Sequence, residues 1–415
     1  MSLLTQASLV LTPTSYKANK LYSVVPSSGN GDMTTTRATT ATRVNSSGLV
    51  ENVATGIPRI DYTNGVANIL LEPQRTNSIP NSTMAGAVLN TTTMPTGWQA
   101  NPNGLTQTIV GIGTENGLNY IDIRFNGVAG ASSNSGIRQT NATTIAALQN
   151  QNWTFCTYIK ILAQPLPATS YQLVIYERSN TGAFLQSTVT SFNNTTLNRI
   201  SHSSTLANAS TAYVQSDIIG NTINGQSYDF TLRIAGTQLE LGSYATSYIP
   251  TTTSTVTRNA DLASVSGVTS LIGQTEGVIF IESSALANDL TTRSMSISDG
   301  TTSNRIIIVY TTVSNQIQCF GTSNGTAFSN SIIYSLTDET QFAKIAIRYR
   351  VNDITLWING AKRGIDITSQ ALPLSFNRLG FDNGAGAALY ISKVKSTQLY
   401  KTYLTDAEMA SLTTL

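Results

Sequence analysis

Residues 344–364 read KIAIRYRVNDITLWINGAKRG, and this stretch decides the fold class. Apolar residues occupy every second position on both sides of a short polar break, which is typical of half-buried antiparallel strands. Ile354, Leu356 and Ile358 form one face, while Trp357 lies on the other face with Thr355. Asn359-Gly360 follows at once, and both residues tolerate the positive φ that a type I′ turn requires. The stretch therefore predicts two antiparallel strands followed by a tight hairpin.

The same signals recur along the whole chain. Asn-Gly occurs nine times, and residues 120–125 and 230–234 alternate in the same way. Many short strands separated by turn signals predict an all-β protein built from sandwiches. Only two helices are expected, at residues 143–151 and at the C-terminus. The second has a capping box, Thr405 with Glu408, after which Met409 and Leu412 face the domain.

Composition limits the class of protein. The chain has 415 residues, more than one hydrophobic core usually organises, so two or three domains are expected. Charged residues make up 11% of it, against roughly 25% in average soluble proteins. The formal net charge of +2 comes without a basic block, which argues against a nucleic-acid partner. Apolar runs are too short for membrane insertion, and the first residues, MSLLTQASLVLTPTSY, do not read as a signal peptide.

Residues with catalytic or metal-binding chemistry are sparse. His202, the only histidine, stands in a Ser-rich stretch and is expected on the surface or on an edge strand. Cys156 and Cys319 lie far apart and are expected to be buried free thiols rather than zinc ligands. The Asp-containing turns at 299–300 and 382–384 match no calcium loop and are explained by turn chemistry. We therefore predict no catalytic residue, no metal and no cofactor.

An enzyme of the glycosidase type stays an open alternative. Such enzymes need two carboxylates that need not be close in sequence. Glu177, Glu240 and Glu282 lie in or near predicted strands, where such enzymes hold theirs. Outward strand positions explain the same residues equally well.

Aromatic residues give the better indication of binding. Aromatic rings stack on the apolar faces of sugars, and tyrosine keeps a polar end at wet surfaces. Trp357 occupies the non-core face of its strand, and Trp98 stands in a loop context, MPTGWQANP. We take these two as candidate glycan-binding residues and place Trp153 in the core. Arg348 and Arg350 are expected to point outward. A covering loop or subunit over Trp357 is the alternative.

A long ordered stretch near the N-terminus carries a family resemblance. Its parts are RATTATRVNSSGLVE (37–51), PRIDY (58–62) and ILLEPQRTN (69–77). It resembles the N-terminal module of fibre or spike proteins of tailed phages, especially those that infect Bacteroidota. Residues 86–250 resemble a carbohydrate-binding-module-like jelly roll, on QLELG (238–242) and ATSYIPT (245–251). Residues 262–415 resemble a concanavalin or laminin G-like sandwich, on ITLWING (354–360), RLG (378–380) and YLTDAEM (403–409).

The resemblance implies three parts and a role. Residues 1–85 would form an extended attachment and trimerisation module, followed by β-sandwich domains at 86–250 and 262–415. The implied protein is a structural virion protein, a head fibre in preference to a tail fibre, made in the host cytoplasm and released by lysis. Its partners would be two further copies in a homotrimer, capsid or tail proteins, and a host-surface polysaccharide. A glycan-active enzyme carrying binding modules and a secreted glycan-binding adhesin are the alternatives.

Overall fold

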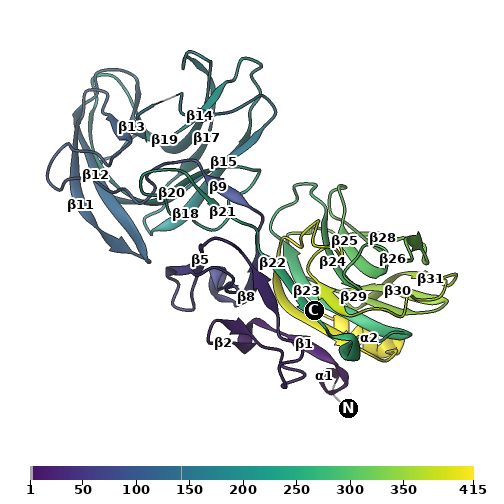
Figure 1. Ribbon diagram of the computed structural model, residues 1–415. Helices are drawn as coiled ribbons and strands as arrows, with labels where there is room; N and C mark the ends of the chain where they lie inside the picture. Colours follow the sequence, from purple (N-terminus) through teal and green to yellow (C-terminus); the bar gives the residue numbers. More distant parts are fainter. Residues whose placement is uncertain (1–2, 142) are drawn as a thin grey trace. The chain divides into compact units, whose positions relative to one another are not determined.

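The computed structural model describes residues 3–141 and 143–415 and is almost entirely β (Figure 1). The chain forms two compact units. We call Met1–Gly48, Asn52–Gln74 and Asn259–Leu415 the terminal unit, and Leu49–Glu51 with Arg75–Arg258 the middle unit. Each is a sandwich of two antiparallel sheets, so the predicted all-β class is confirmed.

The middle unit has two sheets packed around one apolar core. The first runs in the order β10 (Trp98–Asn101), β13 (Ser133–Gln139), β19 (Tyr213–Thr222), β16 (Tyr171–Arg178) and β17 (Phe184–Phe192), with β14 (Ile145–Ala146) beside β19. The second runs β11 (Thr106–Glu115), β12 (Leu118–Val128), β20 (Ser227–Leu241), β15 (Asn152–Leu166) and β18 (Asn198–Thr205). A separate ladder joins β9 (Arg75–Asn77) to β21 (Val256–Arg258). The predicted alternation holds here, because Ile121, Ile123 and Phe125 are all fully buried in this core.

The terminal unit is a larger sandwich. One sheet runs β31 (Ala361–Asp366), β30 (Asp353–Ile358), β29 (Ala343–Arg350), β23 (Glu276–Ala285), β33 (Ser392–Tyr400), β8 (Asn68–Leu71) and β7 (Ile60–Asp61), with β1 (Leu9–Leu11) beside β33. The other runs β27 (Thr326–Ala327), β26 (Gln316–Ser323), β25 (Arg305–Tyr310), β24 (Arg293–Ser298), β32 (Arg378–Gly380), β22 (Leu262–Ser266) and β4 (Thr34–Thr36), with β28 (Ile332–Ser335) beside β26. Strands β1, β4, β7 and β8 come from the predicted N-terminal module, so this segment completes both sheets instead of packing as a separate body.

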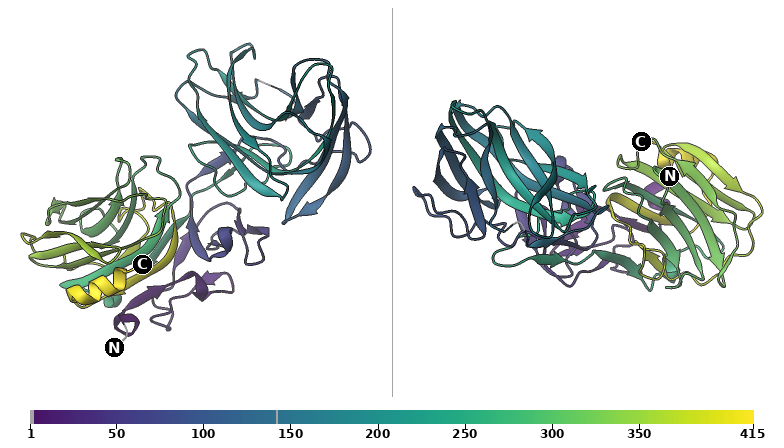
Figure 2. Two further views of the ribbon diagram at one scale, coloured as in Figure 1. Left: turned by 180° about the vertical axis from the view of Figure 1, so that it is seen from behind. Right: turned by 90° about the horizontal axis from the view of Figure 1, so that it is seen from above.

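The remaining elements are short. They are α1 (Leu3–Gln6), α2 (Asp406–Thr413), β2 (Tyr16–Lys17), β3 (Lys20–Leu21), β5 (Ala41–Val44), β6 (Val50–Val53) and the 3-10 turns Pro13–Ser15, Thr63–Gly65 and Thr269–Leu271. Helix α2 begins at the predicted capping box, in which Glu408 N donates to Thr405 Oγ1 and Thr405 N donates to Glu408 Oε2. It lies along the terminal unit's first sheet (Figure 2), and Met409 and Leu412 are buried there as predicted.

The quoted stretch folds as predicted. β29 and β30 pair with each other, and Ile354, Leu356 and Ile358 face the core. Asn359 and Gly360 have φ of 50° and 80°, so β30 and β31 are joined by a turn with positive φ at both central residues. One of the nine Asn-Gly pairs is an exception, since Asn126-Gly127 continues strand β12 without a turn.

Two further predictions have clear outcomes. The helix predicted at 143–151 is wrong, because that segment holds strand β14 and turns, in which Ile145 packs in the core opposite Val214. The thiols of Cys156 and Cys319 are free and buried, as predicted. Burial raises the pKa of Cys156 to about 11 and that of Cys319 to about 12, so both stay protonated at neutral pH.

Candidate functional site

The two tryptophans predicted to bind glycans, Trp98 and Trp357, are both buried, so the expectation that their rings are exposed is wrong. Trp357 is 5% exposed, because helix α2 covers the non-core face of β30 and brings Met409 against the ring. Trp98 is 4% exposed and donates from Nε1 to the carbonyl of Asn81 at 2.8 Å. Neither ring is available to stack on a sugar in this conformation. Trp153 lies in the core, as predicted.

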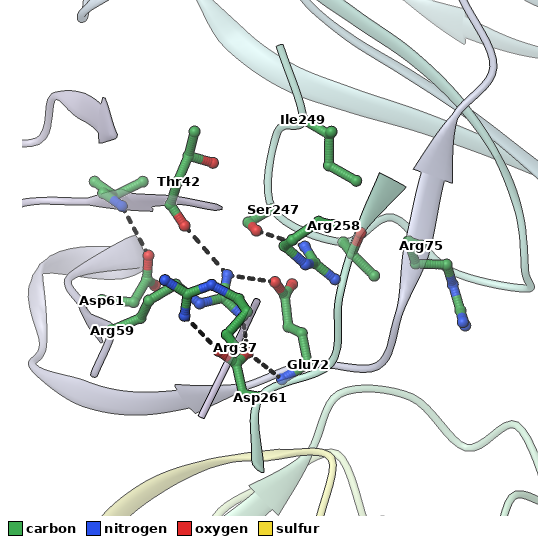
Figure 3. A network of polar contacts seen from close by, with 12 residues as sticks. Arg37, Thr42, Arg59, Asp61, Glu72, Arg75, Ser247, Ile249, Arg258 and Asp261 are labelled. Carbon is green, nitrogen blue, oxygen red and sulfur yellow. Dashed lines mark hydrogen bonds and ion pairs between the residues drawn. The ribbon is translucent and has the colours of Figure 1, made fainter. Parts of the chain in front are cut away.

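The motif residues of the N-terminal stretch form a buried polar network in the terminal unit (Figure 3). Asp261 accepts from Arg37 Nη1 at 2.7 Å and from Arg59, and Arg59 Nη1 also donates to Glu72 at 2.6 Å. All four side chains are at most 4% exposed. Burial works against the charge of Arg59, but the carboxylates of Asp261 and Glu72 together raise its pKa. A buried charge persists only when it is paired in this way.

Other motif residues brace the middle unit. Asn77 donates to the carbonyls of Thr237 and Ile249, at 3.1 and 2.9 Å. Glu240 accepts from both the amide and the hydroxyl of Thr246, at 2.8 and 2.7 Å. These contacts tie β9 and the segment after β20 to the sandwich. The residues that carry the family resemblance are therefore structural, and the functional surface has to be sought elsewhere.

The three glutamates weighed for glycoside cleavage are not brought together. Glu177 accepts from the amides of Ala207 and Asn208, both at 2.9 Å, and from two further side chains, which anchors the loop before β19. Glu240 holds the segment described above, and Glu282 lies 3.6 Å from Lys395 in the terminal unit. Each carboxylate is thus engaged with different parts of the chain.

The histidine and the aspartate turns have local structural partners. His202 is on edge strand β18, as expected, but it is 7% exposed, and its two ring nitrogens lie 2.8 Å from the hydroxyls of Thr190 and Thr188. Asp382 is paired with Arg378, and Asp299 accepts from Thr301. Over residues 3–141 and 143–415, no set of three or more His, Cys, Asp or Glu side chains is grouped to hold a metal ion.

One surface of the middle unit carries charged, polar and aromatic side chains close together on one sheet. We call Arg138, Tyr176, Arg178, Phe184, Gln215 and Asp217 the Arg138–Arg178 cluster. They come from β13, β16, β17 and β19, neighbouring strands of one sheet. Their sequence neighbours Ile137, Ile175, Val214 and Ile218 face the core. Because side chains alternate across a strand, the cluster lies on the outer face of the sheet.

Strand register brings the cluster together. Arg138 stands directly opposite Asp217, and Gln215 stands opposite Tyr176 on the next strand. Arg178 Nη2 donates to Gln215 Oε1 at 2.7 Å. The Arg178 guanidinium lies 4.9 Å from the centre of the Tyr176 ring, and Phe184 meets that ring edge-on at 6.1 Å. Arginine and aromatic planes are therefore interleaved on this face.

Asp217 forms the floor of the cluster and has too few partners. It is fully buried although it belongs to the outer face. Arg138 Nη2 lies 3.0 Å from Oδ2, yet neither carboxylate oxygen accepts a well-aligned hydrogen bond. Arg138 Nε is also buried without a hydrogen-bond partner. Burial raises the pKa of Asp217 to about 7, against the opposing charges of Arg138 and Arg178 and a poorly aligned contact from the Tyr176 hydroxyl.

The exposed part of the cluster can make two kinds of contact. Phe184 is 58% exposed, so its ring is free to stack on an apolar face. The arginine side chains are partly exposed, and a guanidinium presents a planar fork of donors to an oxygen-bearing ligand. Stacking combined with directed polar contacts is the chemistry that recognises a sugar.

Sequence reasoning missed this cluster. Its members are spread over eighty residues and meet only through strand pairing. A signal was present in YQLVIYER, where Gln172, Tyr176 and Arg178 share the face opposite Leu173 and Ile175. Two arginines and one aspartate on adjacent strands are visible only once the strand order is known.

Comparisons with known proteins give distant likenesses. No family model matches the chain, and no curated protein sequence matches it. Among solved structures, a carbohydrate-binding module, CBM40, of the Ruminococcus gnavus IT-sialidase, bound to alpha2,3 sialyllactose, is 14% identical over 34% of this chain and 84% of that one, with a TM-score of 0.30.

Two longer alignments involve other kinds of protein. Domains LG4–5 of the mouse laminin alpha1 chain are 11% identical over 68% of this chain and 92% of theirs, with a TM-score of 0.23. The tripod (BppUct-A-L) from the baseplate of bacteriophage Tuc2009 is 12% identical over 72% of this chain and 98% of that one, also with a TM-score of 0.23. These are partial likenesses, and no functional conclusion rests on them.

Proposed function

We propose that this protein is a non-enzymatic, glycan-binding structural protein displayed as a fibre or spike on a phage particle, on the head in preference to the tail. The observation that carries the glycan-binding part is the Arg138–Arg178 cluster, which combines the exposed Phe184 ring and the half-buried Tyr176 ring with partly exposed arginines on one sheet face. The virion part is supported by the sequence resemblance of residues 31–77 to phage fibre modules.

Two arguments support a binding role over a catalytic one. The carboxylates of Glu177 and Glu240 are each held by three or more hydrogen bonds from the chain itself. A glycosidase instead needs two carboxylates that face each other across a groove, with one left free to donate a proton. A turnover assay on capsular and mucin polysaccharides should give no release of reducing ends, and sustained release would overturn the non-enzymatic proposal.

A homotrimer attached to the particle would make weak sugar contacts useful. Linked copies raise the effective concentration for each further contact, so millimolar single-site affinity suffices for adhesion. Light scattering on the purified chain should give a mass of three copies. A monomer at all concentrations would contradict the trimer without affecting the binding site.

The binding proposal is tested on a glycan array with the full chain. Arg178→Ala and Phe184→Ala should each remove most of the retained signal, whereas Arg124→Ala should not. Arg124 is the matched control, since it is an exposed arginine on the outer face of the other sheet of the same unit, paired with Asp229 at 2.7 Å. An array signal that is absent, or equal in all three variants, would refute the assignment of this surface.

The virion proposal has its own test. Gold-labelled antibody against the chain, applied to purified particles and viewed by electron microscopy, should mark the capsid surface. Label on the tail would move the role to a tail fibre. Intact particles without label would contradict display and favour a secreted adhesin.

A further inference from the structure

We infer that the Arg138–Arg178 cluster selects sugars that carry a carboxylate, such as uronic or sialic acids, over neutral sugars. This inference rests on the proposed glycan-binding function and specifies its ligand. Three features of the site support it: the incomplete charge pairing, the geometry of the two arginines, and the position of Asp217 on the strand between theirs.

Positive charge at the cluster is not fully compensated. Arg178 donates two side-chain hydrogen bonds to Gln215, a neutral amide, at 3.1 and 2.7 Å. Arg138 has one ion-pair contact with Asp217 and a buried Nε without a hydrogen bond. Two guanidinium groups thus share a single carboxyl, which leaves room for a second anion.

The geometry suits a carboxylate in particular. Charge-assisted, bidentate bonding matches the planar guanidinium fork to the two oxygens of a carboxylate. The Tyr176 and Phe184 rings flank Arg178, at 4.9 and 6.0 Å from its central carbon, and offer apolar surface to the ring of the same sugar. A pyranose that carries a carboxylate would satisfy both features at once, whereas a neutral sugar would bring no second anion to the two arginines.

Asp217 acts as a positioning residue that tunes the charge of the site. Charged and titratable groups face it from two other strands: Arg138 from β13, and Tyr176 and Arg178 from β16. When Asp217 is ionised the cluster carries a net charge of about +1, and when it is protonated about +2. A bound carboxylate therefore competes with ionised Asp217 for the arginines, and acidic-sugar affinity rises as Asp217 takes up a proton.

The experiment measures binding of the full chain to matched ligand pairs by calorimetry. The pairs are oligogalacturonate with its methyl ester, and sialyllactose with its methyl ester, and the two members of each pair differ only in the charge of the carboxylate. The acidic member of at least one pair should bind about tenfold more tightly or better, and its affinity should fall as salt is added. From pH 8 to pH 6 its affinity should rise about three- to tenfold, in line with a gain of one positive charge.

Variants separate the roles. Arg138→Lys and Arg178→Lys keep the charge but lose the fork, so they should weaken the acidic ligand while leaving thermal stability close to that of the wild type. Asp217→Asn should keep binding and abolish the rise between pH 8 and pH 6. Arg124→Ala should change neither the affinity nor its pH dependence.

The outcomes distinguish this inference from the function on which it rests. Equal binding of acidic and neutral partners, with loss in Arg178→Ala and Phe184→Ala, would overturn the inference and leave glycan binding in place. Acidic-sugar binding that survives both lysine variants would place the carboxylate elsewhere and also overturn it. If neither the four probes nor any array glycan is retained, the proposed function itself fails.

Discussion

The two outer faces of the middle unit carry similar residues but pair them differently. On the sheet that contains β12 and β20, Arg124 makes two 2.7 Å bonds to Asp229, and Arg233 makes two to Asp122. Glu115 also accepts from Arg233. The hydrogen bonds to Asp122 raise the pKa of Arg233, and the bond to Glu115 and the nearby negative charges raise it further. Burial lowers it but does not outweigh them.

The other face is incompletely paired. Its two arginines share one aspartate, and that aspartate accepts no well-aligned hydrogen bond. Both faces carry arginine, tyrosine and at least one carboxylate, so the kinds of residue present do not separate them. What differs is the number of carboxylates per arginine, and an arginine without a carboxylate of its own can pair with an anionic ligand.

The largest effect is expected from Asp217→Asn. The folded-state pKa of Asp217 is about 7 and its unfolded value is about 3.9, so the folded chain binds more protons between these pH values. Ionised Asp217 therefore costs stability, and the cost grows as pH rises from 4 to 7. At pH 8 the variant should be more stable by about 2–4 kcal/mol, and at pH 4 the two chains should be equal. Urea unfolding across this range measures the difference, and a variant destabilised at pH 8 would mean that Asp217 is well paired.

The next effect is on binding. The double variant Arg178→Ala with Phe184→Ala removes a guanidinium fork and an exposed ring from the cluster. We expect at least about a 100-fold loss of glycan affinity, which is the size of a hot-spot loss. The matched double variant Arg124→Ala with Val128→Ala removes an exposed arginine and a 53% exposed apolar side chain from strand β12, which belongs to the other sheet of the same unit. It should change affinity by less than about twofold, and comparable losses in the two double variants would abolish the distinction between the faces.

The ion pairs on the outer face of the sheet that contains β12 and β20 should contribute to the free energy of unfolding. Asp122→Ala removes the bidentate partner of Arg233, whose side chain is 16% exposed, and should cost about 1–2 kcal/mol in the free energy of unfolding. Asp229→Ala is the control, because its partner Arg124 is 43% exposed and water replaces the lost contact, so the cost should stay below about 0.5 kcal/mol. Glycan affinity should be unchanged in both. Equal costs would show that burial does not determine the strength of these pairs.

Much of the fold was predictable, for local reasons. Period-two alternation and the Asn-Gly turns predicted the strands, and the Thr405–Glu408 capping box predicted helix α2, because these signals depend only on neighbours in sequence. The segment 143–151 was misread as a helix because its apolar residues fit that spacing. Pairing of Ile145 with Val214, from a strand seventy residues away, decides its structure instead.

The candidate site was much less predictable, because tertiary contacts decide exposure. Alternation correctly placed Trp357 and Arg348 on the non-core face of the sheet. It gave no sign that helix α2 covers this face, where Arg348 donates to the carbonyl of Leu404 and pairs with Asp406. Arg350, two residues further on, is exposed as predicted. The Arg138–Arg178 cluster depends on strand order, which no local pattern contains.

The smallest expected effect is the contribution of His202 to the pH dependence of stability. It lies between the sheets at edge strands β17 and β18, and burial lowers its pKa below the ordinary value. The neutral ring is therefore favoured in the folded chain, so its contribution is fully present above about pH 6.5 and is lost as pH falls below that value. In an Asp217→Asn background, which removes the opposing titration, stability should fall between pH 7 and pH 5.5 by less than about 1 kcal/mol. Adding His202→Gln, which keeps an amide donor and acceptor for Thr188 and Thr190, should flatten that slope. If the slope persists, another group takes up the proton, and His202 stays neutral from pH 7 to pH 5.5.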